Sequence, residues 1–156
     1  MFEDSPEGFV ARWRGYSVDA EVFAKTEGNP LIECRIGESV LQLFERTGPY
    51  LSKAGEARLI INPTVDRLEP SAFELTPSLD VGAVSTVAAS GTVLEVDGRT
   101  AVIDAGVPLV VYSLEPLPEH LVKGVAVRFE SHAPVHGFVV PSQQRRNNTR
   151  GSDDDI

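Results

Sequence analysis

The chain has 156 residues, of which 42% are hydrophobic and 24% are charged, so it carries enough apolar side chains to bury a core, which disfavours global disorder. Its formal net charge is −9, and the excess lies before Ser142, where 20 Asp and Glu stand against 11 Lys and Arg. Because polyanions gain affinity from cationic side chains, this balance disfavours nucleic acids and anionic membranes as partners.

The first periodic stretch predicts a β-hairpin. From Tyr16 to Lys25 the even positions are mainly apolar and the odd positions mainly polar, which is typical of a strand with one buried and one exposed face. Phe9 to Arg14 alternates in the same way, and Gly15 can supply the turn between the two strands.

A second hairpin is expected between Leu31–Ile36 and Ser39–Glu45. The two residues between them, Gly37 and Glu38, place glycine first, the arrangement that a type II′ turn prefers. A longer helix over Ser39–Arg46 is the alternative interpretation. A single helical turn is expected over Pro49–Ala54.

Three further strands are expected before a linker. They cover Glu56–Asn62, Val65–Glu69 and Ala72–Thr76. Residues 77–90 begin with a proline and are otherwise rich in Ser, Ala and Gly, with Asp80 as the one charged residue. This composition predicts a linker between an N-terminal β module of residues 1–76 and a C-terminal module of residues 91–141.

The C-terminal module has the clearest hairpin signal, Asp97-Gly98 between two runs rich in β-branched residues. The elements expected there are, in chain order, strands at Gly91–Val96, Arg99–Asp104 and Leu109–Ser113, a helical turn at Pro118–Leu121, and strands at Val125–Glu130 and Gly137–Val140. Residues 142–156 are polar and without periodicity, which predicts a disordered tail.

The predicted fold class is therefore mainly β, with two small antiparallel β modules that are barrels or sandwiches. Over residues 90–141 the order of strands around one helical turn resembles the five-stranded oligonucleotide/oligosaccharide-binding barrel, so the second module is expected to be similar to that barrel. This fold alone would not identify a function, because it hosts many unrelated activities.

Cations and aromatic side chains cluster at Arg12, Trp13, Arg14 and Tyr16. On a strand, Arg12 and Arg14 would point to one side, where the guanidinium pair could hold a phosphate or a carboxylate. An exposed Trp13 could stack on a nucleic-acid base or form a protein-binding hot spot. The alternative is that Trp13 is a core residue and the arginines offset carboxylates of the facing strand.

His132 and His136 lie four residues apart, but Pro134 and Gly137 place them in a loop rather than on one helix face, so no metal site is predicted. They remain candidate binding residues, as does Arg128 on the strand before them. The single cysteine, Cys34, is expected to be a buried core thiol.

No catalytic residue and no cofactor are predicted. The sequence contains no phosphate-binding glycine loop, no Gly-x-Ser-x-Gly and no His-Glu-x-x-His. The leading hypothesis is a non-catalytic binding or adaptor protein that presents an acidic β surface to a basic protein partner, in an inhibitor, immunity-type or assembly-accessory role. The alternatives are single-stranded nucleic-acid binding and a small hydrolase that uses paired carboxylates or the two histidines.

The expected location is the cytoplasm. The residues after Met1 are acidic where a signal peptide would be basic, and no stretch is long and apolar enough for a membrane helix, so no membrane association is expected. Assembly into a homo-oligomer is compatible with the sequence.

Overall fold

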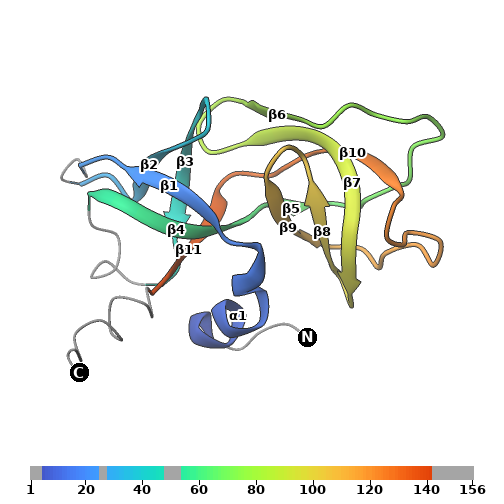
Figure 1. The fold of residues 1–156 in the computed structure, drawn as a ribbon, viewed down its shortest axis with the longest axis horizontal. Coiled ribbons are helices and arrows are strands. Elements are labelled where there is room, and N and C mark those ends of the chain that lie inside the picture. Colours follow the sequence, from blue (N-terminus) through green and yellow to red (C-terminus); the bar gives the residue numbers. More distant parts are fainter. Residues whose placement is uncertain (1–4, 25–27, 48–53, 142–156) are drawn as a thin grey trace, which may run out of the picture.

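A computed structural model describes residues 5–24, 28–47 and 54–141 and confirms that the chain is mainly β (Figure 1). The described elements are α1 (Pro6–Trp13), the 3₁₀ turn η1 (Arg14–Tyr16), β1 (Val18–Val22), β2 (Leu31–Ile36), β3 (Ser39–Glu45), β4 (Gly55–Asn62), β5 (Thr64–Val65), β6 (Ser78–Val81), β7 (Val87–Asp97), β8 (Thr100–Asp104), β9 (Pro108–Ser113), β10 (Ala126–Glu130) and β11 (Val135–Val140). The predicted tail and most of the predicted turn at Pro49–Ala54 lie outside the described residues.

Five strands close into a barrel in the order β1-β2-β3-β11-β4. Neighbouring strands are antiparallel except β3 and β11, which run parallel, and β1 closes the barrel by pairing with β4. A small Greek-key barrel of five strands is the architecture that the sequence predicted for the second module. The structure corrects its position, because four of the five strands come from residues 18–62.

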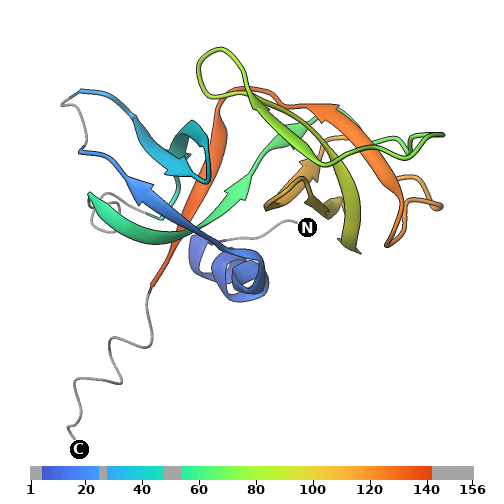
Figure 2. The same cartoon turned by 45° about the horizontal axis from the view of Figure 1, so that its top comes forward.

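The remaining strands form a second sheet in the order β10-β7-β8-β9-β5, with β6 paired to β7. The chain enters this sheet just after Pro63 and returns to the barrel through β11 (Figures 1 and 2). Residues 77–90, which we expected to be a linker, contain β6 and the start of β7. Within this segment, Ala88, Ala89 and Ser90 pair with Glu130, Phe129 and Arg128 of β10.

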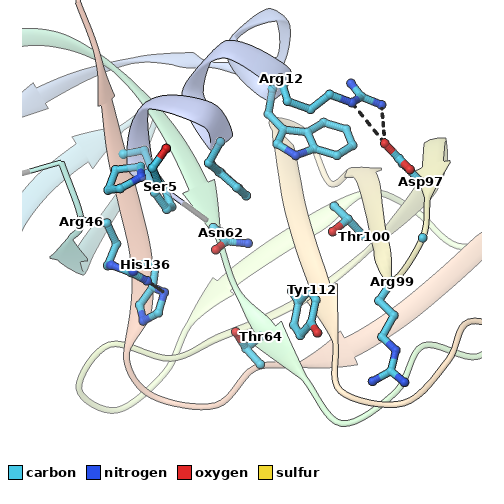
Figure 3. Close-up of a pocket in the computed structure, with 15 residues that line it drawn as sticks. Ser5, Arg12, Arg46, Asn62, Thr64, Asp97, Arg99, Thr100, Tyr112 and His136 are labelled. Carbon is cyan, nitrogen blue, oxygen red and sulfur yellow. Dashed lines mark hydrogen bonds and ion pairs between the residues drawn. The ribbon is translucent and has the colours of Figure 1, made fainter. Parts of the chain in front are cut away.

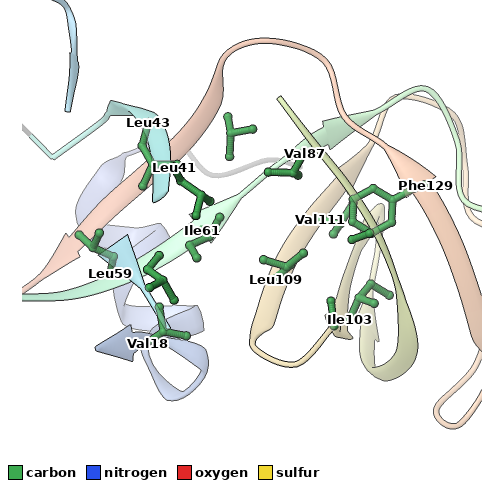
Figure 4. Close-up of a cluster of buried hydrophobic side chains, with 14 of the residues drawn as sticks. Val18, Leu41, Leu43, Leu59, Ile61, Val87, Ile103, Leu109, Val111 and Phe129 are labelled. Atoms are coloured by element: carbon green, nitrogen blue, oxygen red, sulfur yellow. The ribbon is translucent and has the colours of Figure 1, made fainter. Parts of the chain in front are cut away.

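One hydrophobic core joins the two sheets (Figure 4). Barrel residues such as Leu41 and Ile61 share a cluster of buried side chains with Ile103, Leu109 and Phe129 of the second sheet. Cys34 is part of this cluster, and burial raises the pKa of its thiol to about 12. The prediction of a buried core thiol is therefore confirmed.

The first element corrects the sequence prediction, because residues 6–13 form helix α1 rather than a strand. The hydroxyl of Ser5 accepts a hydrogen bond from the amide of Gly8, and Pro6 occupies the first helical turn, where its missing N–H costs nothing. Val10 and Trp13 are three residues apart and fall on one face of the helix, where they are buried.

Helix α1 lies against the junction of the barrel and the second sheet (Figures 1 and 2). Its buried side chains join a second apolar cluster with Ile60 and Phe138 of the barrel and Val102 and Val110 of the second sheet. This contact explains why the ends of β4, β9 and β11 are buried on both faces, one against the core and one against the helix.

Most of the other predicted strands are present, with local differences. The turn at Gly37 has a φ of +61°, as a glycine-first turn requires, and β3 replaces the alternative helix. In the later hairpin Asp97 pairs with Thr100, so the turn residues are Gly98 and Arg99 rather than Asp97 and Gly98. Of the predicted strand Val65–Glu69 only Val65 belongs to β5, and Ala72–Thr76 is not a strand. No helix of the described part is long and apolar enough to span a bilayer.

Candidate functional site

A groove with a volume of about 840 Å³ lies where the barrel, the second sheet and α1 meet (Figure 3). Its lining includes three of the candidate residues from the sequence, Arg12, Trp13 and His136. The other lining residues are Ser5, Pro6, Phe9, Arg46, Asn62, Thr64, Asp97, Gly98, Arg99, Thr100, Tyr112 and Phe138. The groove thus combines arginines, aromatic rings and uncharged polar groups from elements far apart in the sequence.

Arg12 is held by carboxylates of strand β7. Its Nη2 lies 2.5 Å from a carboxylate oxygen of Glu95 and 3.0 Å from one of Asp97. The hydroxyl of Tyr16 donates to the other oxygen of Glu95 at 2.6 Å. The sequence suggested that the arginines offset carboxylates on the next strand of a hairpin, but the carboxylates that pair with Arg12 lie more than 80 residues away in the sequence.

The network around Glu95 makes stability depend on pH. Hydrogen bonds from Tyr16 and from Arg12 lower the pKa of Glu95 in the folded state. Its ionised form therefore stabilises the fold above the ordinary carboxyl value of 4.5, and this contribution is lost as the pH falls through the lower folded-state pKa.

We expect Glu95→Gln to lower the free energy of unfolding at pH 7 by up to about 1 kcal/mol, because the pair is partly exposed and screened by solvent. At a pH below both pKa values the wild-type carboxyl is protonated as well, and the two proteins should become equally stable. Urea denaturation at pH 7 and at low pH checks this, with Glu119→Gln on an exposed loop as the control. A constant difference at both pH values would contradict the role assigned to the charge.

Trp13 is only 4% exposed, and its ring packs in the apolar cluster beneath α1. Arg12 covers it, with its guanidinium carbon 3.8 Å from the ring centroid. This burial agrees with the alternative of a core tryptophan and leaves no free ring face for base stacking. Arg14 is exposed in η1, and Arg128 is exposed on β10, outside the groove.

The two histidines are held by different partners. His132 Nε2 lies 2.8 Å from a carboxylate oxygen of Asp66, and both side chains are exposed. His136 lies on β11, where Arg46 Nη1 is 3.2 Å from its Nδ1 and Phe44 packs beside its ring. Burial, and then the charge of Arg46, lower the pKa of His136. The structure therefore brings His136, but not His132, to the groove.

Several groove residues were not identified from the sequence, among them Arg46, Asn62, Thr64 and Tyr112. Asn62, Thr64 and Tyr112 are single polar residues on strands, Arg46 directly follows β3, and only strand pairing brings the four together. Asn62 carried a usable signal, because it follows the apolar run Leu59-Ile60-Ile61 and a polar side chain that continues a buried strand needs a hydrogen-bond partner there. It is indeed buried, with 8% of its surface exposed.

A second distinctive surface is the outer side of β1, β2 and β4, which we call the acidic face. It carries four exposed carboxylates and two arginines: Asp19, Glu21, Glu33, Glu56, Arg35 and Arg58. Arg58 pairs with Asp19 at 2.6 Å, and Arg35 pairs with Glu21. Among the described residues, neither Glu33 nor Glu56 has an ion-pair partner. The face therefore keeps a net negative charge.

One pairing on the acidic face is unfavourable for the isolated protein. Strand register places Glu21 directly opposite Glu56. Like charges at directly opposed positions destabilise an antiparallel pair, by about 0.2–1 kcal/mol by analogy with other cross-strand pairs. Glu21 also lies opposite Arg35 of β2 and pairs with it, which offsets part of this repulsion and leaves Glu56 as the carboxylate of the two without a cation among the described residues.

No protein-family model matches the sequence, and no curated protein shows significant similarity to it.

In the described ranges, no three His, Cys, Asp or Glu side chains gather closely enough to hold a metal ion.

Proposed function

We propose that the protein is a non-catalytic binding module that recognises a basic surface of another protein through the acidic face. The observation that carries this proposal is the cross-strand pair of Glu21 and Glu56, together with the carboxylate of Glu33, which has no ion-pair partner in the part of the chain that the structure describes. Opposite charges steer association and favour the correct partner over others. Cationic side chains of a basic partner placed against this face would offset the repulsion that the free protein tolerates.

Apolar side chains beside the acidic face support recognition of a protein. On β3, Val40 is 41% exposed and Phe44 is 38% exposed, and Val40 lies opposite Arg35 in the strand register. Exposed apolar and aromatic side chains next to charges are typical of protein interfaces, in which aromatic residues are enriched.

The charge of the same surface speaks against nucleic acid. In barrels with this architecture, oligonucleotides bind to the face formed by the second and third strands. The corresponding face here is formed by β2 and β3, where Glu33 lies opposite Gln42. The next cross-strand pair contains Arg35, whose guanidinium already pairs with Glu21. Phosphate groups need free cations, and the described residues of this face offer none.

The test is affinity capture of proteins from a lysate of the native host, at low and at high salt. The wild-type protein is expected to retain a partner at low salt and to lose it at high salt, because screening weakens attraction between exposed charges. Charge reversal at Glu56→Lys with Glu33→Lys should abolish retention, whereas Glu115→Lys with Glu119→Lys, on a remote loop, should not.

A stability measurement makes this test specific. Glu56→Lys replaces a repulsive cross-strand pair by an attractive one, and Glu33 lies opposite the uncharged Gln42, so the double variant should unfold with a free energy about 0.2–1 kcal/mol higher than the wild type while binding is lost. Loss of binding in a variant that is more stable than the wild type cannot result from misfolding. Retention that is unchanged by charge reversal, or capture of nucleic acid instead of protein, would overturn the proposal.

A further inference from the structure

The groove exposes a polar row of the second sheet that α1 leaves uncovered. Strand register aligns Thr64, Tyr112 and Thr100 side by side across β5, β9 and β8, and all three line the groove. Two residues further along β8 and β9, the same face carries Val102 and Val110, which pack against α1. The helix therefore covers the apolar part of this face and ends before the polar part.

This polar row has hydrogen-bonding capacity that the protein leaves unused. Among the described residues, the hydroxyls of Thr64, Thr100 and Tyr112 make no hydrogen bond. Asn62 donates through Nδ2 to the carbonyl of Val110 at 2.7 Å, but its Oδ1 accepts nothing from the described residues. Because Asn62 is more than nine-tenths buried, an unsatisfied acceptor here is costly unless water or a ligand supplies a donor.

The opposite wall of the groove supplies a cation. His136 lies beside Asn62 in the strand register, and Arg46 contacts its Nδ1. Arginine can only donate, so Nδ1 must accept and the neutral imidazole carries its proton on Nε2. No described carboxylate pairs with Arg46, in contrast to Arg12, which is neutralised by Glu95 and Asp97. Within the described part of the chain, Arg46 is therefore a free cation beside His136. Arg99, on the other side of the groove in Figure 3, instead donates to the carbonyl oxygen of Leu114.

An apolar wall adjoins Arg46. The rings of Phe9 and Phe138 are stacked with centroids 4.2 Å apart, and the guanidinium carbon of Arg46 lies 5.8 Å from the Phe138 ring centroid. Figure 3 shows Arg46 and His136 on one side of Asn62 and Thr100 and Tyr112 on the other. A volume of about 840 Å³ falls in the range of sites for small organic ligands.

We infer that the groove binds a small ligand in which an anionic group, carboxylate or phosphate, is attached to a planar ring that carries hydrogen-bonding atoms. Arg46 binds the anionic group, with His136 fixing its position. The Oδ1 of Asn62 accepts a hydrogen bond from the ring, and the hydroxyls of Thr64, Thr100 and Tyr112 bind its remaining polar atoms. This site is separate from the acidic face, so either proposal can fail without the other.

Two probes distinguish the source of the anion: nicotinate, which carries a carboxylate, and adenosine monophosphate, which carries a phosphate. Each is titrated against the full chain by NMR, with nicotinamide and adenosine as their uncharged counterparts. We expect at least one anion to shift the backbone signals of His136, Asn62 and Thr100. Its uncharged counterpart should bind about tenfold more weakly or worse, because hydrogen bonds to charged groups contribute more than neutral ones.

Variants then test the assigned residues. Arg46→Gln should weaken binding of the anion by about tenfold or more, while Arg128→Gln, an exposed arginine outside the groove, should leave it unchanged. Thr100→Val keeps the shape of the side chain but removes its hydroxyl, and it should weaken binding of the ligand several-fold. This second variant tests the site even if the Arg46→Gln protein does not fold. Equal binding by the Arg46 and Arg128 variants, or shifts from neither anion at the groove, would overturn the inference.

Discussion

Replacing Trp13 by alanine is expected to lower the free energy of unfolding by about 3–5 kcal/mol, the usual cost of truncating a large buried aromatic side chain. Trp13 is 4% exposed and packs in the cluster that joins α1 to both sheets, with Ile60 and Phe138 on the barrel side and Val102 and Val110 on the other. The cavity cannot close easily, because its walls are strands fixed by their own hydrogen bonds.

The measurement is urea denaturation followed by circular dichroism, because the variant lacks the only tryptophan of the protein. Phe73→Ala is the control, since Phe73 is 78% exposed and its truncation should change stability by less than about 0.5 kcal/mol. If the two variants were equally stable, α1 would not hold the junction of the two sheets, and the groove beside it would lose one wall.

The alternation of side chains predicted most of the strands correctly. In β1 and β2 buried and exposed residues alternate strictly, because one face meets the core and the other meets solvent. The nearly continuous apolar run from Leu109 to Ser113 was also predicted correctly as a strand, β9, and Leu109–Val111 are buried on both faces of the sheet. Local pattern suffices here because each strand meets one environment on each face.

The N-terminal helix shows where the local pattern is ambiguous. Over a stretch as short as Phe9 to Arg14, apolar residues at 9, 10 and 13 fit a helix face as well as an alternating strand. The deciding signal was the helix start, Ser5 followed by Pro6, which forms an N-cap and a first helical position. The error mattered for function, because it placed Arg12 and Trp13 on opposite faces of a strand that does not exist.

The long-range pairings could not be predicted from local sequence. β11 completes the barrel by lying between β3 and β4, although about 70 residues separate it from β4 in the chain. Nothing in the sequence of β11 specifies these partners. The groove depends on this pairing, because it brings His136 next to Asn62 and near Arg46, and so the sequence identified His136 without its surroundings.

The sequence predicted the negative charge of the acidic face, but not which of its carboxylates and arginines lie opposite each other. The excess of carboxylates before Ser142 already pointed to a basic partner. Which carboxylates remain without a cation depends on the register of β1 against β4, which sets Glu21 opposite Glu56 and Asp19 opposite Arg58. A shift of that register by one residue would move the side chains of the shifted strand to the other face and break these pairings.

Gly91→Ala is expected to destabilise the fold by about 3 kcal/mol or more, because the added methyl group would collide with backbone atoms that cannot move away independently. A Cβ at this position would lie 2.0 Å from the carbonyl oxygen of Asp104 and 2.7 Å from its carbonyl carbon. Gly91 is buried in β7, opposite Val127 of β10, while its neighbour Thr92 pairs with Asp104 of β8. Two strands therefore hold the backbone in place on either side.

The matched control is Gly15→Ala, which adds the same methyl group where no atom lies within 4 Å and φ is not positive. Gly15 lies in η1, so its replacement should leave stability unchanged or raise it by up to about 1 kcal/mol, through the smaller entropy of the unfolded chain. Urea denaturation of both variants checks the contrast. Equal stability would mean that β7 and β8 can separate at Gly91 at little cost, which is incompatible with a sheet whose strands share one tightly packed core with the barrel.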